Sequence, residues 1–146
     1  MSAPILARAL LTAIAAGQGI APLFIDLNRT HATNPLWPGH ARFHVVWQTF
    51  SQTLIAAAEV ALLWWPAPAM PQRFYLAALL IAGPLAAFLL AMFTRTLYGG
   101  TLHDPNGIPP VRIHAGQRVI QFDLNAVIII FAAALVVLSV WAFSSN

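Results

Sequence analysis

Four long apolar stretches, separated by short polar connections, set the pattern of this chain. They lie at about residues 4–25, 40–65, 73–98 and 117–143. Each stretch reaches the roughly 20 residues that an α-helix needs to cross the hydrocarbon layer of a membrane. The pattern predicts an all-α fold, an integral membrane four-helix bundle in which residues 1–146 form a single domain.

Composition strengthens this prediction and limits the possible functions. Hydrophobic residues make up 60% of the chain and charged residues only 8%, whereas soluble domains have about 25% charged residues. The net charge of +3 comes from arginines without a single lysine, which does not indicate a nucleic-acid surface. The absence of cysteine excludes disulfides and thiolate chemistry. The first apolar stretch contains an arginine and is long enough to span, so we expect a membrane helix rather than a cleaved signal peptide.

Four spans would place both long connections on one membrane face, with the termini and the short connection at 66–72 on the other. This topology brings all five histidines to one face: His31, His40, His44, His103 and His114. Five of the seven arginines lie there as well. Because cytoplasmic connections are enriched in arginine and lysine, we expect this histidine-rich face to be cytoplasmic.

The second predicted helix carries a polar stripe. At 100° per residue, one third of its circumference holds six polar side chains: His40, His44, Gln48, Ser51, Gln52 and Glu59. Polar groups inside a membrane helix must face protein or a water-filled cavity. The stripe therefore predicts either the lining of a cavity or a set of hydrogen bonds between helices. Arg8 is the expected partner of the deep Glu59.

His40 and His44 are spaced so that both side chains lie on one helical face. Two side chains at this spacing can chelate a metal ion. The further ligands of such a site would come from His31, His103, His114, Asp26 or Asp104. The alternative is acid–base chemistry by His40 and His44 near neutral pH, with Asp26 orienting one of them and Arg42 or Arg118 stabilising negative charge. We expect Arg118, Gln121 and Asn125 to share one face of the fourth helix and to complete the cavity. The candidate catalytic residues are Asp26, His31, His40, Arg42, His44, His103 and Arg118.

The segment THATNPLWPGHARFHVVWQ resembles the signature of a family of small four-span membrane proteins whose function is unassigned. The resemblance rests on ten residues and on Asp26 and Asn28 just before them: His31, Asn34, Pro35, Trp37, Pro38, His40, Ala41, Arg42, Phe43 and His44. It covers about a sixth of the chain closely. It implies the four-span fold and supplies no activity.

Two functional interpretations fit these patterns. The first is an enzyme or binding protein for a lipid-soluble substrate, such as an isoprenoid, a quinone or an acyl compound. The second is an accessory subunit of a larger membrane complex, photosynthetic or respiratory, where a histidine would ligate a pigment or haem. A transporter fits less well, because four spans form a pore only as an oligomer. The expected partners are the lipid bilayer, a lipid-like molecule and further copies or subunits, with no nucleic acid.

Overall fold

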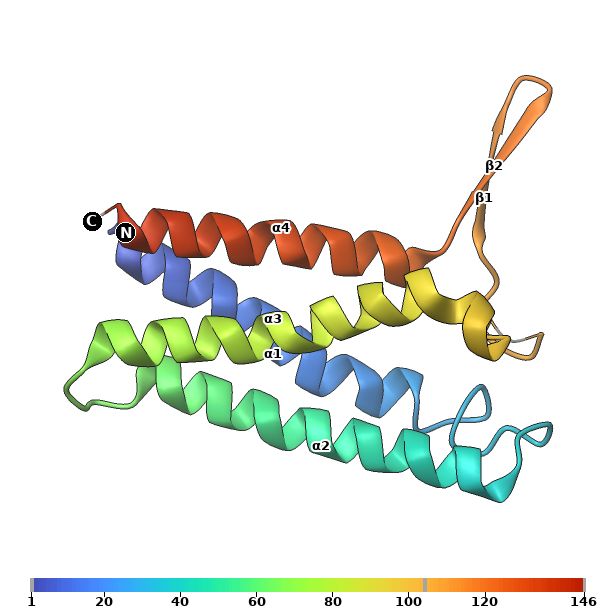
Figure 1. Cartoon of the computed structure of the whole chain (residues 1–146), viewed down its shortest axis with the longest axis horizontal. Helices are drawn as coiled ribbons and strands as arrows, with labels where there is room; N and C mark the ends of the chain where they lie inside the picture. Colours follow the sequence, from blue (N-terminus) through green and yellow to red (C-terminus); the bar gives the residue numbers. More distant parts are fainter. Residues whose placement is uncertain (1, 104, 146) are drawn as a thin grey trace.

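The computed structural model of the chain describes residues 2–103 and 105–145 and contains four long helices. They are α1 (Ala3–Ile25), α2 (Gly39–Trp64), α3 (Met70–Thr94) and α4 (Leu124–Ser144). A short 3₁₀ helix, η1 (Arg95–Tyr98), continues α3, and a hairpin of β1 (Val111–Ala115) and β2 (Arg118–Phe122) precedes α4 (Figure 1). The predicted all-α class is confirmed, with the hairpin as an addition.

Three segments are long and apolar enough to cross a membrane: Ala3–Ile25, Met70–Tyr98 and Leu124–Ser144. Their mean hydropathies are 1.4, 2.4 and 2.8, so the chain is a membrane protein. The 26-residue α2 is long enough but does not belong to this set. Its histidines and glutamines lower its hydropathy, so length and composition support three of the four predicted spans.

The helices run side by side, with the chain connections gathered at two ends. Both termini and the short turn between α2 and α3 lie at one end (Figure 1). The connection at 26–38, η1 and the hairpin lie at the other, which we call the loop end. There the Asn106 side-chain amide donates a hydrogen bond of 3.4 Å to Asn34 Oδ1, so the two long connections meet although they are 72 residues apart.

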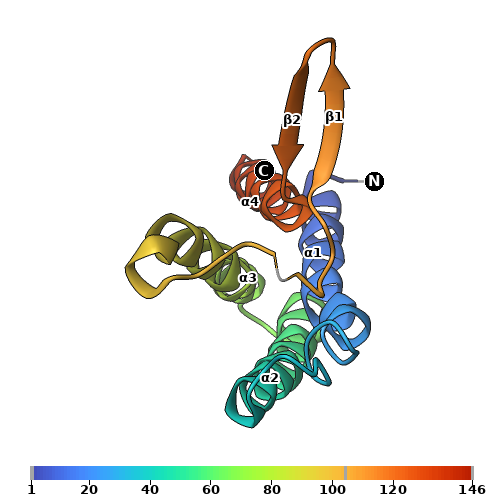
Figure 2. The same cartoon turned by 90° about the vertical axis from the view of Figure 1, so that its right-hand side faces the viewer.

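The hydrophobic core fills the half of the bundle near the termini. Phe74 of α3 stacks on Phe143 of α4 with ring centroids 3.8 Å apart. The other members of the core come from all four helices: Ala7, Leu11, Ile14, Ala15, Leu63, Ala77, Ala78, Ile81, Leu85 and Val136. Figure 2, seen from the loop end, shows the near ends of α2 and α3 diverging. The bundle is therefore closed at one end and open at the other.

Helices α1 and α2 approach closely at Gly19. A Cβ atom on Gly19 would lie 2.5 Å from Ala56 Cβ, closer than two carbon atoms can pack. The absence of a side chain also lets Thr53 Oγ1 donate a hydrogen bond of 2.8 Å to the Gly19 carbonyl. The small residues of the first helix thus allow the close packing that their composition suggests.

The turn between α2 and α3 is held by Arg73. Its guanidinium donates to the carbonyls of Leu62 (3.2 Å), Trp65 (2.6 Å) and Ala67 (2.5 Å). A cation at this position satisfies carbonyls at the C-terminal end of α2 and interacts favourably with the helix dipole. These contacts stabilise a tight turn in which Ala69 adopts a left-handed backbone conformation, with φ 61°.

The fourth helix begins at Leu124, seven residues later than the sequence pattern predicts. Residues 118–122 instead pair with 111–115 as antiparallel strands, with Ile113 opposite Ile120. Gly116 begins the turn between them at φ +60°, a conformation that glycine adopts without strain. Asp123 then caps α4 by accepting a hydrogen bond of 3.0 Å from the Ala126 amide.

Candidate functional site

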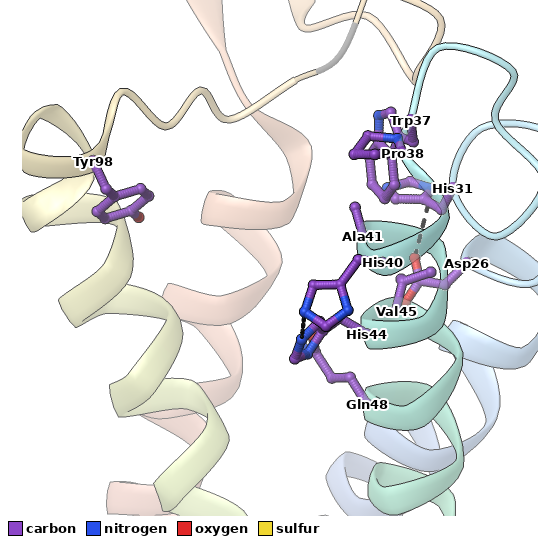
Figure 3. A pocket seen from close by; sticks show the side chains of 10 residues that line it. All are labelled: Asp26, His31, Trp37, Pro38, His40, Ala41, His44, Val45, Gln48 and Tyr98. Atoms are coloured by element: carbon purple, nitrogen blue, oxygen red, sulfur yellow. Dashed lines mark hydrogen bonds and ion pairs between the residues drawn. The ribbon is translucent and has the colours of Figure 1, made fainter.

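A hollow of about 1100 Å³ opens at the loop end between α2 and η1. Most of its wall comes from the connection at 26–38 and the start of α2, and Tyr98 of η1 lies across from it (Figure 3). The lining residues are Asp26, His31, Trp37, Pro38, His40, Ala41, His44, Val45, Gln48 and Tyr98. The hollow therefore combines titratable side chains with apolar and aromatic walls.

His40 and His44 form a directly bonded pair on the wall of this hollow. Their Nε2 atoms are 3.0 Å apart and their rings meet edge to face, with centroids 4.5 Å apart. Because both atoms belong to imidazoles, one ring must donate its N–H and the other must accept through a lone pair. Both side chains are exposed to the hollow (Figure 3). The pair thus offers an acid and a base side by side.

His40 and His44 would supply two ligands for a metal ion, which is fewer than a complete site needs. Two metal–nitrogen bonds of about 2.1 Å in tetrahedral geometry would hold the two ring nitrogens about 3.4 Å apart, so the 3.0 Å contact of this pair is that of a hydrogen bond. Among the described residues, no group of three or more histidine, aspartate or glutamate side chains could hold a metal ion. Protein zinc sites use three or four ligands. Asp104, one of the predicted completing ligands, lies outside the described residues.

Asp26 and His31 form a second titratable pair at the hollow. Asp26 Oδ1 lies 3.8 Å from His31 Nδ1, which also hydrogen-bonds Thr30 Oγ1 at 2.8 Å. Burial raises the pKa of Asp26 above its ordinary value, and the nearby His31 opposes that rise. Trp37 contacts the edge of the His31 ring at 5.3 Å between centroids and fixes it from the other side. Asp26 was predicted to orient His40 or His44, but its carboxyl group lies beside His31 instead.

Asparagines shape the connection that carries these residues. Asn34 is fully buried, donates to the Thr30 carbonyl at 3.0 Å and accepts from the Leu36 amide at 3.0 Å. Asn28 Oδ1 accepts from the Thr30 amide at 2.8 Å. Side chains that bond to nearby backbone in this way replace secondary structure in a loop. They hold the connection in a shape that places His31 and Trp37 beside α2.

Only part of the polar stripe on α2 reaches the hollow. Gln48 lines it, whereas Ser51 and Gln52 are half-buried and Glu59 is fully buried deeper in the bundle. Within the described part of the chain, several buried polar atoms have no hydrogen-bond partner: Gln18 Oε1, Thr49 Oγ1, Gln52 Nε2 and both oxygens of Glu59. Buried groups of this kind are usually satisfied by internal water. The stripe therefore divides into an open part and an enclosed part.

The predicted pairing of Arg8 with Glu59 does not form. Arg8 donates two hydrogen bonds to the Leu63 carbonyl, of 2.9 Å from Nε and 2.6 Å from Nη2. Its guanidinium also lies 4.1 Å from the centre of the Trp64 ring. The carbonyl is one helical turn beyond Glu59 and, being near the end of α2, needs a donor. Arg8 thus caps the helix and leaves the carboxyl group unpaired.

The other predicted site residues lie away from the hollow. Arg42 and His103 are exposed and are not among its lining residues. Arg118 and Gln121 are exposed on β2 rather than on the fourth helix, and Asn125 is exposed in the first turn of α4. The five therefore do not form one constellation with His40 and His44.

Two aromatic side chains at the hollow were not among the predicted site residues. Trp37 lines the hollow from the connection at 26–38 and Tyr98 lines it from η1. Tyr98 also lines a smaller hollow of about 170 Å³ with Arg95. For Trp37, the proline on either side (Pro35 and Pro38) signals a rigid loop that fixes its direction.

A family model matches residues 10–139, from the first half of α1 to the last turns of α4. The chain belongs to the family of unknown function DUF6640. The matched range includes every residue that lines the hollow. It is consistent with the resemblance to a family of unassigned function. No curated protein and no solved structure matches the chain.

Proposed function

We propose that the hollow at the loop end binds the polar head of a lipid-soluble molecule, and that His40 and His44 act on it as an acid–base pair. The observation that carries this proposal is the 3.0 Å contact between their Nε2 atoms on the wall of a hollow of about 1100 Å³. Ligand sites are typically concave, mostly apolar and equipped with a few polar groups.

The walls suggest the class of ligand. Trp37, Pro38, Ala41, Val45 and Tyr98 present apolar surface, while the imidazoles and the Gln48 amide offer hydrogen bonds. A molecule with a polar head and a long apolar tail satisfies both, as an isoprenoid, a quinone or an acyl compound does. The volume exceeds the usual range of about 300–1000 Å³ for small-molecule sites, so the start of a tail fits together with the head.

Each polar residue has a distinct role in this proposal. The His40–His44 pair transfers a proton to or from the head, with one ring as donor and the other as acceptor. Asp26 orients His31, whose imidazole binds the head from the loop side. Arg42, His103 and Arg118 are left out because they do not line the hollow.

The proposed placement in the membrane has four crossings, with α2 as the fourth span and its stripe turned toward the hollow and the other helices. The arginine bias then puts the loop end in the cytoplasm. A cysteine introduced by Pro105→Cys, in this cysteine-free chain, should react with a membrane-impermeant maleimide only from the cytoplasmic side. Reaction from the opposite side alone would reverse the orientation.

The test of the binding function is the lipid content of the purified protein. Lipids extracted after purification in mild detergent should contain one species enriched over the membrane average, measured by mass spectrometry. The double substitution His40→Gln and His44→Gln should reduce this enrichment at least tenfold. The matched control His114→Gln changes a histidine that is exposed on β1 and should retain it.

Two outcomes would contradict the proposal. One is the absence of any enriched species, and the other is equal enrichment in the double variant. If the wild type instead copurifies with large membrane subunits and a visible absorption band, the accessory-subunit function replaces the proposed one.

A further inference from the structure

The β1–β2 hairpin extends sideways from the bundle instead of continuing along the helix axes. In Figure 1 it rises from the loop end roughly across the direction of the helices, and in Figure 2 it projects outward beyond α4. Phe122, the last residue of β2, is separated from α4 only by the capping residue Asp123. Because α4 is apolar enough to cross the membrane, the hairpin must begin at the membrane surface and run over the lipid beside the bundle.

One face of the hairpin is apolar and uncovered. The strand register puts Val111 opposite Phe122 and Ile113 opposite Ile120, and these four side chains share a face. Val111, Ile113 and Ile120 expose 38%, 49% and 50% of their surface. An isolated two-stranded ribbon is marginally stable in water and normally packs its apolar face against something. The described part of the chain does not cover this face, so something outside the chain must.

The charges of the hairpin indicate what covers it. Residues 105–122 contain Arg112 and Arg118 and no aspartate or glutamate. The next acidic residue, Asp123, is engaged in capping α4. Arg118 follows the turn at the far tip, and Arg112 lies near the base on the opposite face from Ile113. Cationic side chains at both ends of an apolar ribbon complement a surface that is apolar within and anionic at its headgroups.

We propose that the hairpin is an interfacial anchor that docks on the surface of a bilayer containing anionic phospholipids. Val111, Ile113, Ile120 and Phe122 enter the boundary between headgroups and acyl chains, and Arg118, which lies on the same face at the tip, reaches the lipid phosphates. Bidentate hydrogen bonds suit the guanidinium for this role. Arg112 lies on the opposite face near the base, where its charge adds to the attraction to an anionic surface. This inference does not depend on the proposed ligand of the hollow.

The test uses the natural absence of cysteine, which allows one spin label for each variant. Ile113→Cys places a label on the apolar face and Gln121→Cys places one on the opposite face. Each labelled protein is put into nanodiscs of phosphatidylcholine alone or with phosphatidylglycerol, one protein per disc. Electron paramagnetic resonance then compares collisions of the label with oxygen, which enters lipid, and with a water-soluble nickel chelate.

With phosphatidylglycerol, the label at position 113 should be reached by oxygen and shielded from the chelate, whereas the label at position 121 should remain open to the chelate. Replacing both arginines, by Arg112→Gln and Arg118→Gln, should lower the ratio of docked to undocked hairpin about fivefold per arginine in these discs. It should change little in phosphatidylcholine alone. Circular dichroism verifies that each variant retains its helices.

Two results would overturn the proposal. The first is equal access of the chelate to both labels in both kinds of disc, which would mean a hairpin standing free in water. The second is a label at position 113 that is open to the chelate in these single-protein discs and shielded only in a second set of discs that each hold two protein molecules, which would assign the apolar face to a second copy of this chain.

Discussion

Asp26 is placed where the chain leaves α1, and its surroundings oppose its charge. Burial raises the pKa of its carboxyl group above the ordinary value of 3.8, while the His31 imidazole, 3.8 Å away, lowers it. Burial is the larger of the two effects. The folded protein therefore binds the Asp26 proton more tightly than the unfolded chain does, and its ionised form carries a cost in stability.

This cost has a defined dependence on pH. Below pH 3.8 the carboxyl group is protonated in both states and adds no cost, and the cost grows as the pH rises through the raised pKa of the folded state. We expect the midpoint of thermal unfolding, measured in detergent, to fall for the wild type relative to Asp26→Asn as the pH is raised from about 4. His31→Gln removes the opposing attraction and should make the fall steeper. Parallel curves for the wild type and Asp26→Asn would contradict this account.

Residue types could predict the histidine pair but not the partner of every charged residue. His40 and His44 were predictable because their separation of four residues puts any two side chains on one helical face. The hydrogen bonds of Arg8 were not predictable, because its acceptor is the backbone carbonyl of Leu63 and every residue type has such a carbonyl. The guanidinium meets that carbonyl and not Glu59, and only the register of α1 against α2 decides between them.

At the scale of the elements, the contact between α1 and α2 depends on one glycine. Gly19 faces Ala56 at a distance that leaves no room for a methyl group, whereas Gly17, two residues earlier on the same helix, has nothing within 4 Å of the corresponding position. The two glycines therefore provide a matched pair, because replacement by alanine at the two positions of the same helix should have opposite effects on stability.

We expect Gly19→Ala to destabilise the bundle by about 1–3 kcal/mol, because the added methyl group overpacks a contact between two helix backbones. Gly17→Ala should stabilise it by roughly 0.5–1 kcal/mol, since alanine restricts the unfolded chain and favours helix. Unfolding in a series of denaturing detergent mixtures measures both. A loss of stability in Gly17→Ala equal to that in Gly19→Ala would show that the packing at Gly19 is not special.

The hairpin is the element that the sequence pattern predicted wrongly, because it assigned residues 118–122 to the fourth helix. Residues 118–122, RVIQF, are mostly apolar and lie directly before the apolar residues of α4. The two segments together resemble one long apolar helix, so the predicted helix began too early and included the strand. The signals for a hairpin were nevertheless present. Two runs rich in valine and isoleucine flank Gly116, which is the composition of strands joined by a tight turn. The apolar run outweighed these signals because its length matched a membrane span.

At the scale of the whole molecule, a packed half and an open half follow from where the small and large residues lie. Near the termini, the alanines and leucines of α1 and α3 meet Leu63 and the stacked pair Phe74–Phe143 in a dense core. At the loop end, α2 carries His40, His44 and Gln48, and the hollow opens beside them. The open half is thus set by the same polar stripe that gives the site its chemistry.

The sequence could predict the meeting of the two long connections, since the two long helices between them return the chain to the same end of the bundle. It could not predict which of them would line the hollow. The first connection and α2 supply nearly all of the wall, whereas His103 and His114 of the second are exposed elsewhere. The hairpin carries His114 away from the bundle, and that element was not foreseen.

The hollow between α2 and η1 is proposed to receive a lipid-soluble molecule. This proposal is tested most directly by photo-crosslinking with a fatty acid that carries a diazirine near its carboxyl group, followed by mass spectrometry of the labelled peptides. Adducts should concentrate on residues 37–48 and on Tyr98, and should be lost from these positions after His40→Gln and His44→Gln. Adducts spread only over the outer surfaces of α3 and α4, and unchanged in that double variant, would contradict the account.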